Sequence, residues 1–510
     1  MRPLTVDRLN ELLLFSALVL LIAVAAVRLS SRSGLPSLLL YLGIGIALGQ
    51  DGLGIPFDDA ELTQVLGYTA LIIILAEGGL TTRWSDIRPA VPSAAVLATA
   101  GVGISVAVTA SAAHYLIGLD WQLALLMGAV VSSTDAAAVF SVLRRVRLPK
   151  RLSGVLEAES GFNDPPVIIL VVTFATLDTV GPWYVISGQI ALQLAIGLAV
   201  GLAVGKIGEF GLRQVALPAA GLYPIAVLTL TVLAYACGSM LQGSGFLAVY
   251  VAALVLGNAR LPHRPATRGF AEALAWVAQI GLFVLLGMLV TPHLLWPDVL
   301  PAVVIGLALS LVARPLSVVL CTLPFRMPWR EQALVSWAGL RGAVPIVLAT
   351  IPMVNEVDGS DRIFNMVFVL VVVFTLLQGP TLPWLTRILG LHSRDESAME
   401  IDIESAPLDR LRGHLLSVSI PQSSRMHGVE VAELRLPQAS SVVLVVREGT
   451  SFVPEPTTAL RRGDELLVVA TDPVRDAVER RLLSVGRGGK LAGWLRGGGG
   501  STAYRAPGRK

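Results

Sequence analysis

The sequence predicts an all-α polytopic membrane protein with about 13 transmembrane helices in two inverted six-helix repeats, followed by a small cytoplasmic α+β domain. The 510-residue chain is 54% hydrophobic and 15% charged, whereas a typical soluble protein has about 25% charged residues. Its mean hydropathy is +0.71. Many apolar runs also reach the ~20 residues that a membrane-spanning helix needs. This composition excludes a disordered chain, a secreted disulfide scaffold and an ordinary soluble enzyme.

The apolar runs lie between residues 10 and 389, separated by gaps too short to hold a folded domain. The first run ends in small residues that resemble a cleavage site, but it is too long for a signal peptide, so we expect it to remain as a span. The expected spans are roughly 10–29, 35–50, 62–80, 90–113, 121–143, 155–177, 183–210, 222–240, 243–258, 270–291, 298–322, 331–352 and 363–389.

Basic residues predict the orientation of the spans, because Lys and Arg are enriched in cytoplasmic loops. One set of alternate loops holds 16 basic residues, and the opposite set holds only Arg362 when the N-terminal tail is left out. The N-terminus is therefore expected outside and the C-terminus in the cytoplasm. The 16 residues are Arg28, Arg32, Arg83, Arg88, Arg144, Arg145, Arg147, Lys150, Arg151, Lys206, Arg213, Arg260, Arg264, Arg268, Arg326 and Arg330.

The composition becomes polar after residue 390, which predicts a second domain. We expect a transmembrane domain at 1–390, an acidic linker at 391–406, a regulatory domain at 407–486 and a disordered Gly-rich basic tail at 487–510. Alternating and helical hydrophobic patterns predict the elements of the regulatory domain. These are strands at 415–420, 441–447 and 464–471 and helices at 428–436 and 474–483.

Three acids and two arginines lie well inside the expected spans, away from their ends: Asp135, Glu159, Asp164, Arg314 and Arg341. Each charge at the middle of a bilayer costs at least about 2.5 kcal/mol, so each one needs a partner or a function. Glu159 and Asp164 are separated by about 140° around a helix, so one can pair while the other faces water. We expect Glu159 to pair with Arg341. Asp164, with Asp135 nearby, is then the free carboxylate, surrounded by the oxygen ligands that a hard cation prefers.

Glycine and proline predict that the twelfth span is interrupted, at Gly339, Gly342 and Pro345. An interrupted helix offers free carbonyl groups to a cation and places helix dipoles at mid-membrane. The fifth span, with Ser132–Asp135, contains no such breaker and lies seven spans earlier. An odd offset implies an inverted repeat, which pairs spans 1–6 with spans 8–13.

Four motifs resemble the monovalent cation:proton antiporter-1 family, the sodium/proton exchangers, over about residues 10–390. They are Ile74–Leu80 (ILAEGGL), Ser133–Asp135 (STD), Glu159–Asp164 (ESGFND) and Gly339–Pro345 (GLRGAVP). The resemblance implies that Asp164 binds the cation and the proton, in a homodimer. Glu77, in the first motif, lies near the end of a span and is expected to be structural.

The same resemblance implies roles for the residues around Asp164. Thr134, Asp135 and Ser160 would complete the site of a monovalent cation, and Asn163 before Asp164 is the pair associated with electroneutral exchange. Glu159 with Arg341 would form a structural ion pair, and Arg314 would be a second structural arginine.

The C-terminal region resembles the TrkA C-terminal (RCK-C) domain through Thr458–Leu460 and Gly463–Leu466. The combination with the exchanger motifs is similar to the NhaP2 subfamily of bacterial potassium/proton antiporters. No GxGxxG follows a strand, so the nucleotide-binding half of full potassium-channel regulators is absent from the sequence, and the regulatory ligand stays open.

The function expected from these observations is secondary-active exchange of K⁺ or Na⁺ for H⁺ by alternating access around Asp164, in the cell (inner) membrane. We expect membrane lipids and possibly a small regulatory ligand as partners, no cofactor, no nucleic acid and no enzyme activity. Two alternatives are a gated potassium efflux channel and an antiporter-like subunit of a respiratory proton pump. A channel often has a carbonyl filter such as TVGYG, and none is visible in this sequence. The subunits of respiratory pumps depend on lysines at mid-membrane, and this chain has no lysine at the centre of an expected span.

Overall fold

The computed structural model describes residues 6–33, 36–55, 57–143, 148–176, 183–215, 217–391, 402–408, 413–421, 424–471 and 473–489. The chain divides into two compact units, Met1–His392 and Ser393–Lys510, each described here by itself. Some of the sequence predictions lie outside the described residues: the basic positions 144–147, most of the linker 391–406 and nearly all of the tail 487–510.

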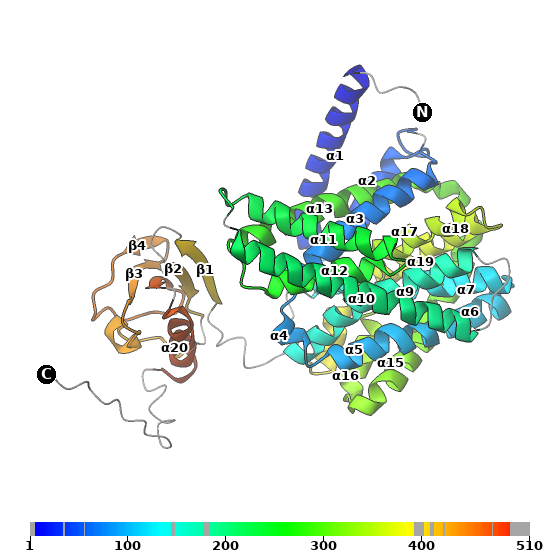
Figure 1. Cartoon of the computed structure of the whole chain (residues 1–510). Helices are drawn as coiled ribbons and strands as arrows, with labels where there is room; N and C mark the ends of the chain where they lie inside the picture. Colours follow the sequence, from blue (N-terminus) through cyan, green and yellow to red (C-terminus); the bar gives the residue numbers. More distant parts are fainter. Residues whose placement is uncertain are drawn as a thin grey trace. The chain divides into compact units, whose positions relative to one another are not determined.

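The first unit is helical throughout its described residues (Figure 1). Its first helices are α1 (Val6–Ser33), α2 (Ser37–Leu48), α3 (Ala60–Thr81), α4 (Trp84–Ile87), α5 (Val91–Val96), α6 (Val102–Ile117), α7 (Trp121–Val130), α8 (Ala136–Val142) and α9 (Lys150–Thr176). They are followed by α10 (Trp183–Gln214), α11 (Leu222–Met240), α12 (Gly245–Asn258), α13 (Arg264–Leu289), α14 (Trp296–Ala308), α15 (Arg314–Thr322), α16 (Trp329–Trp337), α17 (Ala343–Leu348), α18 (Thr350–Val354) and α19 (Ser360–Ile388).

Seven helices among the described residues are long and apolar enough to cross a membrane: 60–81, 91–117, 184–214, 222–240, 264–289, 296–325 and 360–388. Five shorter apolar helices lie at 13–28, 37–48, 121–130, 245–258 and 343–354. The helix α9 is long, but it carries the charged residues of the ESGFND region. These helices confirm a mostly helical membrane protein.

Two of the expected spans are interrupted. The twelfth is broken between α16 and α17, at the glycines that predicted the break, whereas Pro345 lies inside α17. The fifth is also broken, between α7 and α8, which the sequence did not predict because no glycine or proline lies there. Asp135 explains this second break: it is the N-cap of α8, and its side chain accepts a hydrogen bond from the Ala138 N–H at 3.1 Å. An N-cap residue starts a new helix.

The fourth and eleventh spans share another irregularity. A π-helical turn, η1 (Leu97–Gly101), joins α5 to α6, and a second, η3 (Leu309–Ala313), joins α14 to α15. The order of elements is therefore the same twice: a span with a π turn, a broken span, and then a long helix, α9 or α19. Isolated π turns occur mostly at functional sites of helices.

Small residues bring α3 and α12 close together beside the broken spans. A Cβ added to Gly79 would collide with Ala253 and with the Tyr250 carbonyl oxygen, and one added to Gly257 would collide with the backbone of Leu80. Glycine permits this approach, as is common where membrane helices pack. The packing fixes the position of the Tyr250 ring relative to the end of α3.

The second unit is a five-stranded antiparallel sheet with one helix. The strand order is β1-β2-β5-β3-β4. The elements are β1 (Asp402–Leu408), β2 (Gly413–Ser419), β3 (Ser440–Arg447), β4 (Thr450–Phe452), β5 (Glu465–Thr471) and α20 (Arg475–Gly488). Apolar residues of β2, β3 and β5 form its core with Val478, Leu482 and Val485 of α20.

Two details of this unit differ from the sequence prediction. The end of the expected linker, 402–406, belongs to β1, which pairs with β2 as an edge strand. The expected helix 428–436 is only a short 3₁₀ turn at Val431–Leu434. Pairing of Glu430 with Ala459 in an isolated β-bridge keeps the preceding residues extended, so a full helix cannot form there.

Asp464 is the buried polar residue that joins β3 to the start of β5. Its carboxylate accepts hydrogen bonds from Arg447 Nε at 2.8 Å, Arg447 Nη2 at 2.7 Å and the Arg461 N–H at 2.7 Å. Burial by itself raises the pKa of Asp464, but these hydrogen bonds and the two arginine charges outweigh it and lower the pKa below the usual value. The ionised carboxylate therefore stabilises this unit.

We predict that Asp464→Asn destabilises the second unit at pH 7. The loss of hydrogen bonds to a charged acceptor costs about 2 kcal/mol of unfolding free energy. This cost corresponds to a roughly thirtyfold faster exchange of the protected amides. Hydrogen–deuterium exchange of the β2 and β5 amides in the full-length protein measures this change. Because the folded pKa is lowered, the wild type should keep this stability above about pH 4 and lose it below.

The exposed acid Asp476, at the start of α20, provides the control. Asp476→Asn removes the same charge without a buried partner and should leave protection in β2 and β5 nearly unchanged. Equal protection in Asp464→Asn and the wild type at pH 7 would contradict the stabilising role.

Candidate functional site

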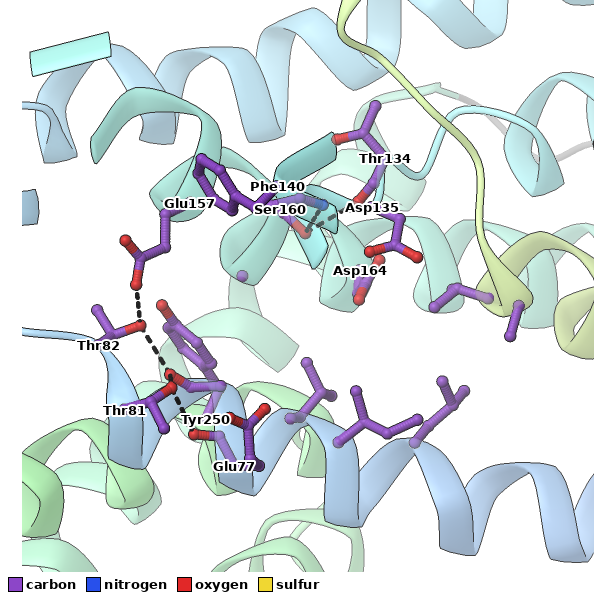
Figure 2. A pocket seen from close by; sticks show the side chains of 18 of the residues that line it. Glu77, Thr81, Thr82, Thr134, Asp135, Phe140, Glu157, Ser160, Asp164 and Tyr250 are labelled. Atoms are coloured by element: carbon purple, nitrogen blue, oxygen red, sulfur yellow. Dashed lines mark hydrogen bonds between the residues drawn. The ribbon is translucent and has the colours of Figure 1, made fainter. Parts of the chain in front are cut away.

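A cavity of about 440 Å³ lies inside the first unit, between α3, α8, α9, α12, α13 and α17 (Figure 2). Four carboxylates line it, those of Glu77, Asp135, Glu157 and Asp164. Its described lining includes neither lysine nor arginine. A cavity lined by charges of one sign, here negative, attracts cations.

Asp164 borders this cavity from the middle of α9. Its side chain is 6% exposed, and it accepts a hydrogen bond from Ser133 Oγ at 2.5 Å. Among the residues that the structure describes, Asp164 forms no ion pair. The carboxylate is thus removed from bulk solvent but open to a cavity, as a site that exchanges ions requires.

The extended stretch between α7 and α8 is held against α9 by side chains of both. Asn163 Nδ2 donates to Thr134 Oγ1 at 2.6 Å, and Ser160 Oγ donates to the Thr134 carbonyl at 3.0 Å and accepts from the Ala136 N–H at 3.1 Å. Thr134 and Ser160 line the cavity with Asp164, whereas Asn163 lies behind the wall. The structure therefore brings four of the five predicted binding residues (Thr134, Asp135, Ser160 and Asp164) to one cavity and gives Asn163 a positioning contact.

The two interrupted spans cross where their helices stop. The Asp135 N–H donates to the Leu340 carbonyl at 2.8 Å, so the non-helical segment between α7 and α8 is hydrogen-bonded to the one between α16 and α17. Gly342 contacts the Asp135 side chain so closely that a Cβ there would collide with the carboxylate. The crossing brings together the N-termini of α8 and α17 and the C-termini of α7 and α16, whose partial charges are positive and negative respectively.

The buried ion pair differs from the expected one. Glu159 pairs with Arg314, with 2.7 Å between Oε1 and Nη1, and both side chains are almost fully buried. Arg341, the expected partner, instead donates from Nε to the Val131 carbonyl at 3.0 Å and from Nη1 to the Gly339 carbonyl.

The interruptions explain this correction. The carbonyl groups of Val131 and Gly339 follow the last turns of α7 and α16, where helical donors are missing. Arg341 lies on the broken stretch itself and supplies those donors. Arg314, at the start of α15, therefore neutralises Glu159 of α9. Because α9 is continuous through Pro165 and Pro166, Glu159 and Asp164 face different directions, as the sequence predicted.

Several polar lining residues were not assigned to the site from the sequence, among them Glu77, Thr82, Glu157 and Tyr250. Glu77, expected to be structural, lies on the cavity wall. Glu157 precedes Asp164 by seven residues, which is two helical turns and the same face of α9. That spacing was visible in the sequence. Tyr250 and Thr82 reach the cavity only through the packing of α3 on α12.

Comparisons with known proteins agree with this architecture. Residues 17–388 match the family described as "Sodium/hydrogen exchanger, transmembrane", and residues 415–483 match the TrkA-C domain. In structure, the chain is similar to the sodium proton antiporter MjNhaP1 from Methanocaldococcus jannaschii, with a TM-score of 0.66 and 22% identity. The match covers 75% of this chain and 99% of that one. At this identity the likeness shows the fold.

Relatives with higher identity cover nearly the whole chain. The K(+)/H(+) antiporter NhaP of Alkalimonas amylolytica is 36% identical over 91% of this chain and 82% of its own length. The K(+)/H(+) antiporter NhaP2 of Shewanella oneidensis is 36% identical over 92% of this chain and 83% of its own. The Na(+)/H(+) antiporter ApNhaP of Aphanothece halophytica is 27% identical over 75% of this chain and 77% of its own. With these matches over both its units, the chain belongs to the sodium/hydrogen exchanger family.

Proposed function

We propose that this protein is a secondary-active antiporter that exchanges K⁺ or Na⁺ for H⁺ at Asp164. The observation that carries the proposal is a buried carboxylate that forms no ion pair with any residue in the described part of the chain, on a cavity lined by acids and hydroxyl groups. K⁺ is favoured as the cation, because the 36% identical relatives are K(+)/H(+) antiporters and the Na(+)/H(+) antiporter ApNhaP is only 27% identical.

Competition for one carboxylate couples the two ions. A cation that reaches the cavity displaces the proton from Asp164 and is held there by the carboxylate with oxygens of Thr134, Asp135 and Ser160. A proton that arrives from the other side displaces the cation in turn. Asn163 holds Thr134 in place without adding a second charge, so one positive charge moves in each direction and exchange is electroneutral.

Alternating access would come from rocking of the helices around the crossing. Thirteen spans in two inverted six-helix repeats are supported by the repeated order of π turn, broken span and long helix. An inverted repeat is the usual basis of alternating access in secondary transporters. The ratio of 16 basic residues to one favours an N-terminus outside and a C-terminus in the cytoplasm of the cell (inner) membrane.

The TrkA-C unit is proposed to regulate exchange. This unit comes directly after the membrane unit in the sequence. We propose that it responds to a small ligand and that the whole protein is a homodimer. As part of this proposal, the exchanger domain is 1–390 and the expected limits 391–406, 407–486 and 487–510 are moved: the linker ends before β1 at Asp402, and the regulatory domain runs from Asp402 to the end of α20 at Gly488.

We predict that Asp164→Asn abolishes exchange and leaves the protein folded. Asparagine has nearly the shape of aspartate and still accepts from Ser133, but it carries neither the negative charge nor the exchangeable proton. Purified protein in proteoliposomes with a pH-sensitive dye inside should show no cation-driven change in internal pH with K⁺, Na⁺ or Li⁺.

The matched control is Glu209→Gln, which removes an acid that pairs with Lys206 and Arg213 away from this cavity. This variant should exchange like the wild type. Undiminished exchange by Asp164→Asn would exclude Asp164 as the coupling site.

We also predict that the exchange rate does not depend on membrane potential. One monovalent cation leaves for each proton that enters, so no net charge crosses the membrane. The initial rate in proteoliposomes should stay the same when an inside-negative or an inside-positive potential is imposed at constant pH gradient. A rate that changes steeply with potential would show that more than one proton moves for each cation.

A further inference from the structure

Glu157 lines the same cavity two helical turns before Asp164 on α9. Its Oε1 accepts a hydrogen bond from Thr82 Oγ1 at 2.5 Å, across 75 residues of sequence. Seven residues separate it from Asp164, which places the two carboxylates on one face of α9 and about 10 Å apart along the helix axis. Of the four carboxylates that line the cavity, Glu157 therefore lies away from Asp164, and exchange at Asp164 does not use it.

Tyr250 supplies an independent observation at this position. The residue is 3% exposed, and its hydroxyl lies beside Thr82 but makes no hydrogen bond of ordinary length and angle with the described residues. Figure 2 shows the ring inside the cavity with its hydroxyl directed toward Glu157 and Thr82. A buried hydroxyl without a partner costs about 1–3 kcal/mol. Such an oxygen, beside a carboxylate, is suited to an occupant of the cavity.

The charge around this position is negative. The helix α3 ends at Thr81, no basic residue lies in its last turn, and Thr82 is its C-cap. A helix C-terminus carries a partial negative charge that attracts cations. The nearby guanidinium of Arg268 donates to the Leu80 carbonyl, but it does not line the cavity. Carboxylate, hydroxyl and helix terminus therefore all favour a positive ion.

Oxygen atoms also continue from this position toward Asp164. Gly161 lines the cavity between the two carboxylates, and Pro165, four residues later, has no N–H to donate to the Gly161 carbonyl. Ser160 adds a hydroxyl on the same face of α9. An ion that leaves Glu157 thus meets polar groups before it reaches Asp164.

We propose, on the basis of the exchange function above, that Glu157, Thr82 and the Tyr250 hydroxyl form an outer site. A K⁺ or Na⁺ ion binds this site on its way from the cytoplasm to Asp164. The outer site raises the local concentration of the cation but takes no part in the competition with the proton. Its loss therefore weakens cation binding and leaves the maximal rate of exchange unchanged.

The test is exchange in proteoliposomes over a range of K⁺ concentrations for Glu157→Gln and Tyr250→Phe. Glutamine still accepts from Thr82, so the contact between α3 and α9 remains and only the charge is lost. We expect the half-saturating K⁺ concentration to rise about tenfold in Glu157→Gln, the equivalent of about 1.4 kcal/mol, and about threefold in Tyr250→Phe. The maximal rate should stay within about twofold of the wild type.

Glu209→Gln is again the matched control, and it should keep the half-saturating concentration of the wild type. A Glu157→Gln variant with wild-type half-saturation would overturn the outer site. So would a lower maximal rate at unchanged half-saturation, because that result assigns Glu157 to the contact with Thr82 alone. Should Glu157→Gln fail to fold, as judged by size-exclusion chromatography, Tyr250→Phe decides in the same way.

The result is independent of the proposed coupling site. Asp164→Asn tests that site by complete loss of exchange, whereas the outer site concerns only the concentration dependence of a protein that still exchanges. Loss of exchange in Asp164→Asn together with unchanged half-saturation in Glu157→Gln would therefore leave the exchange function standing and reject the outer site.

Discussion

The arrangement of the membrane unit depends on one constraint: backbone N–H and C=O groups inside a bilayer must find partners within the protein. The two broken helices leave some of these groups without a partner in their own helix, and contacts at the crossing provide the partners. The Asp135 N–H pairs with the Leu340 carbonyl, the Asp135 side chain caps α8, and Arg341 donates to the ends of α7 and α16. Only with these contacts can an extended stretch bring Ser133 and Thr134 against Asp164.

The same constraint explains why the sequence predicted some features and missed others. Glycines at 339 and 342 are a local signal, so the break of the twelfth span could be predicted. The break of the fifth span depends on the Leu340 carbonyl, which is more than 200 residues away in the chain, and no local pattern in Ser132–Asp135 contains that information. Non-local partners decide such positions.

The charged residues show the same division. Sequence reasoning placed Asp164 at the cavity and Glu159 in a buried pair, because the angular separation on a helix is fixed by its geometry. It chose the wrong arginine, since nothing local distinguishes Arg314 from Arg341, and only the tertiary packing makes Arg314 the partner. Glu157 was overlooked although its spacing from Asp164 was visible, because its significance depends on Tyr250 and Thr82 from other helices.

Pro165 and Pro166 have a mechanical consequence for α9. Two successive residues without N–H groups leave the carbonyls of Gly161 and Phe162 without their helical donors, in the turn that contains Asp164, although the helix remains continuous. The turns that precede Gly161, which carry Glu157, contain no proline, and the weaker turn lies between Glu157 and Asp164. The two halves of α9 can therefore tilt about this turn without breaking a further helical hydrogen bond, and such a tilt changes the spacing between Glu157 and Asp164.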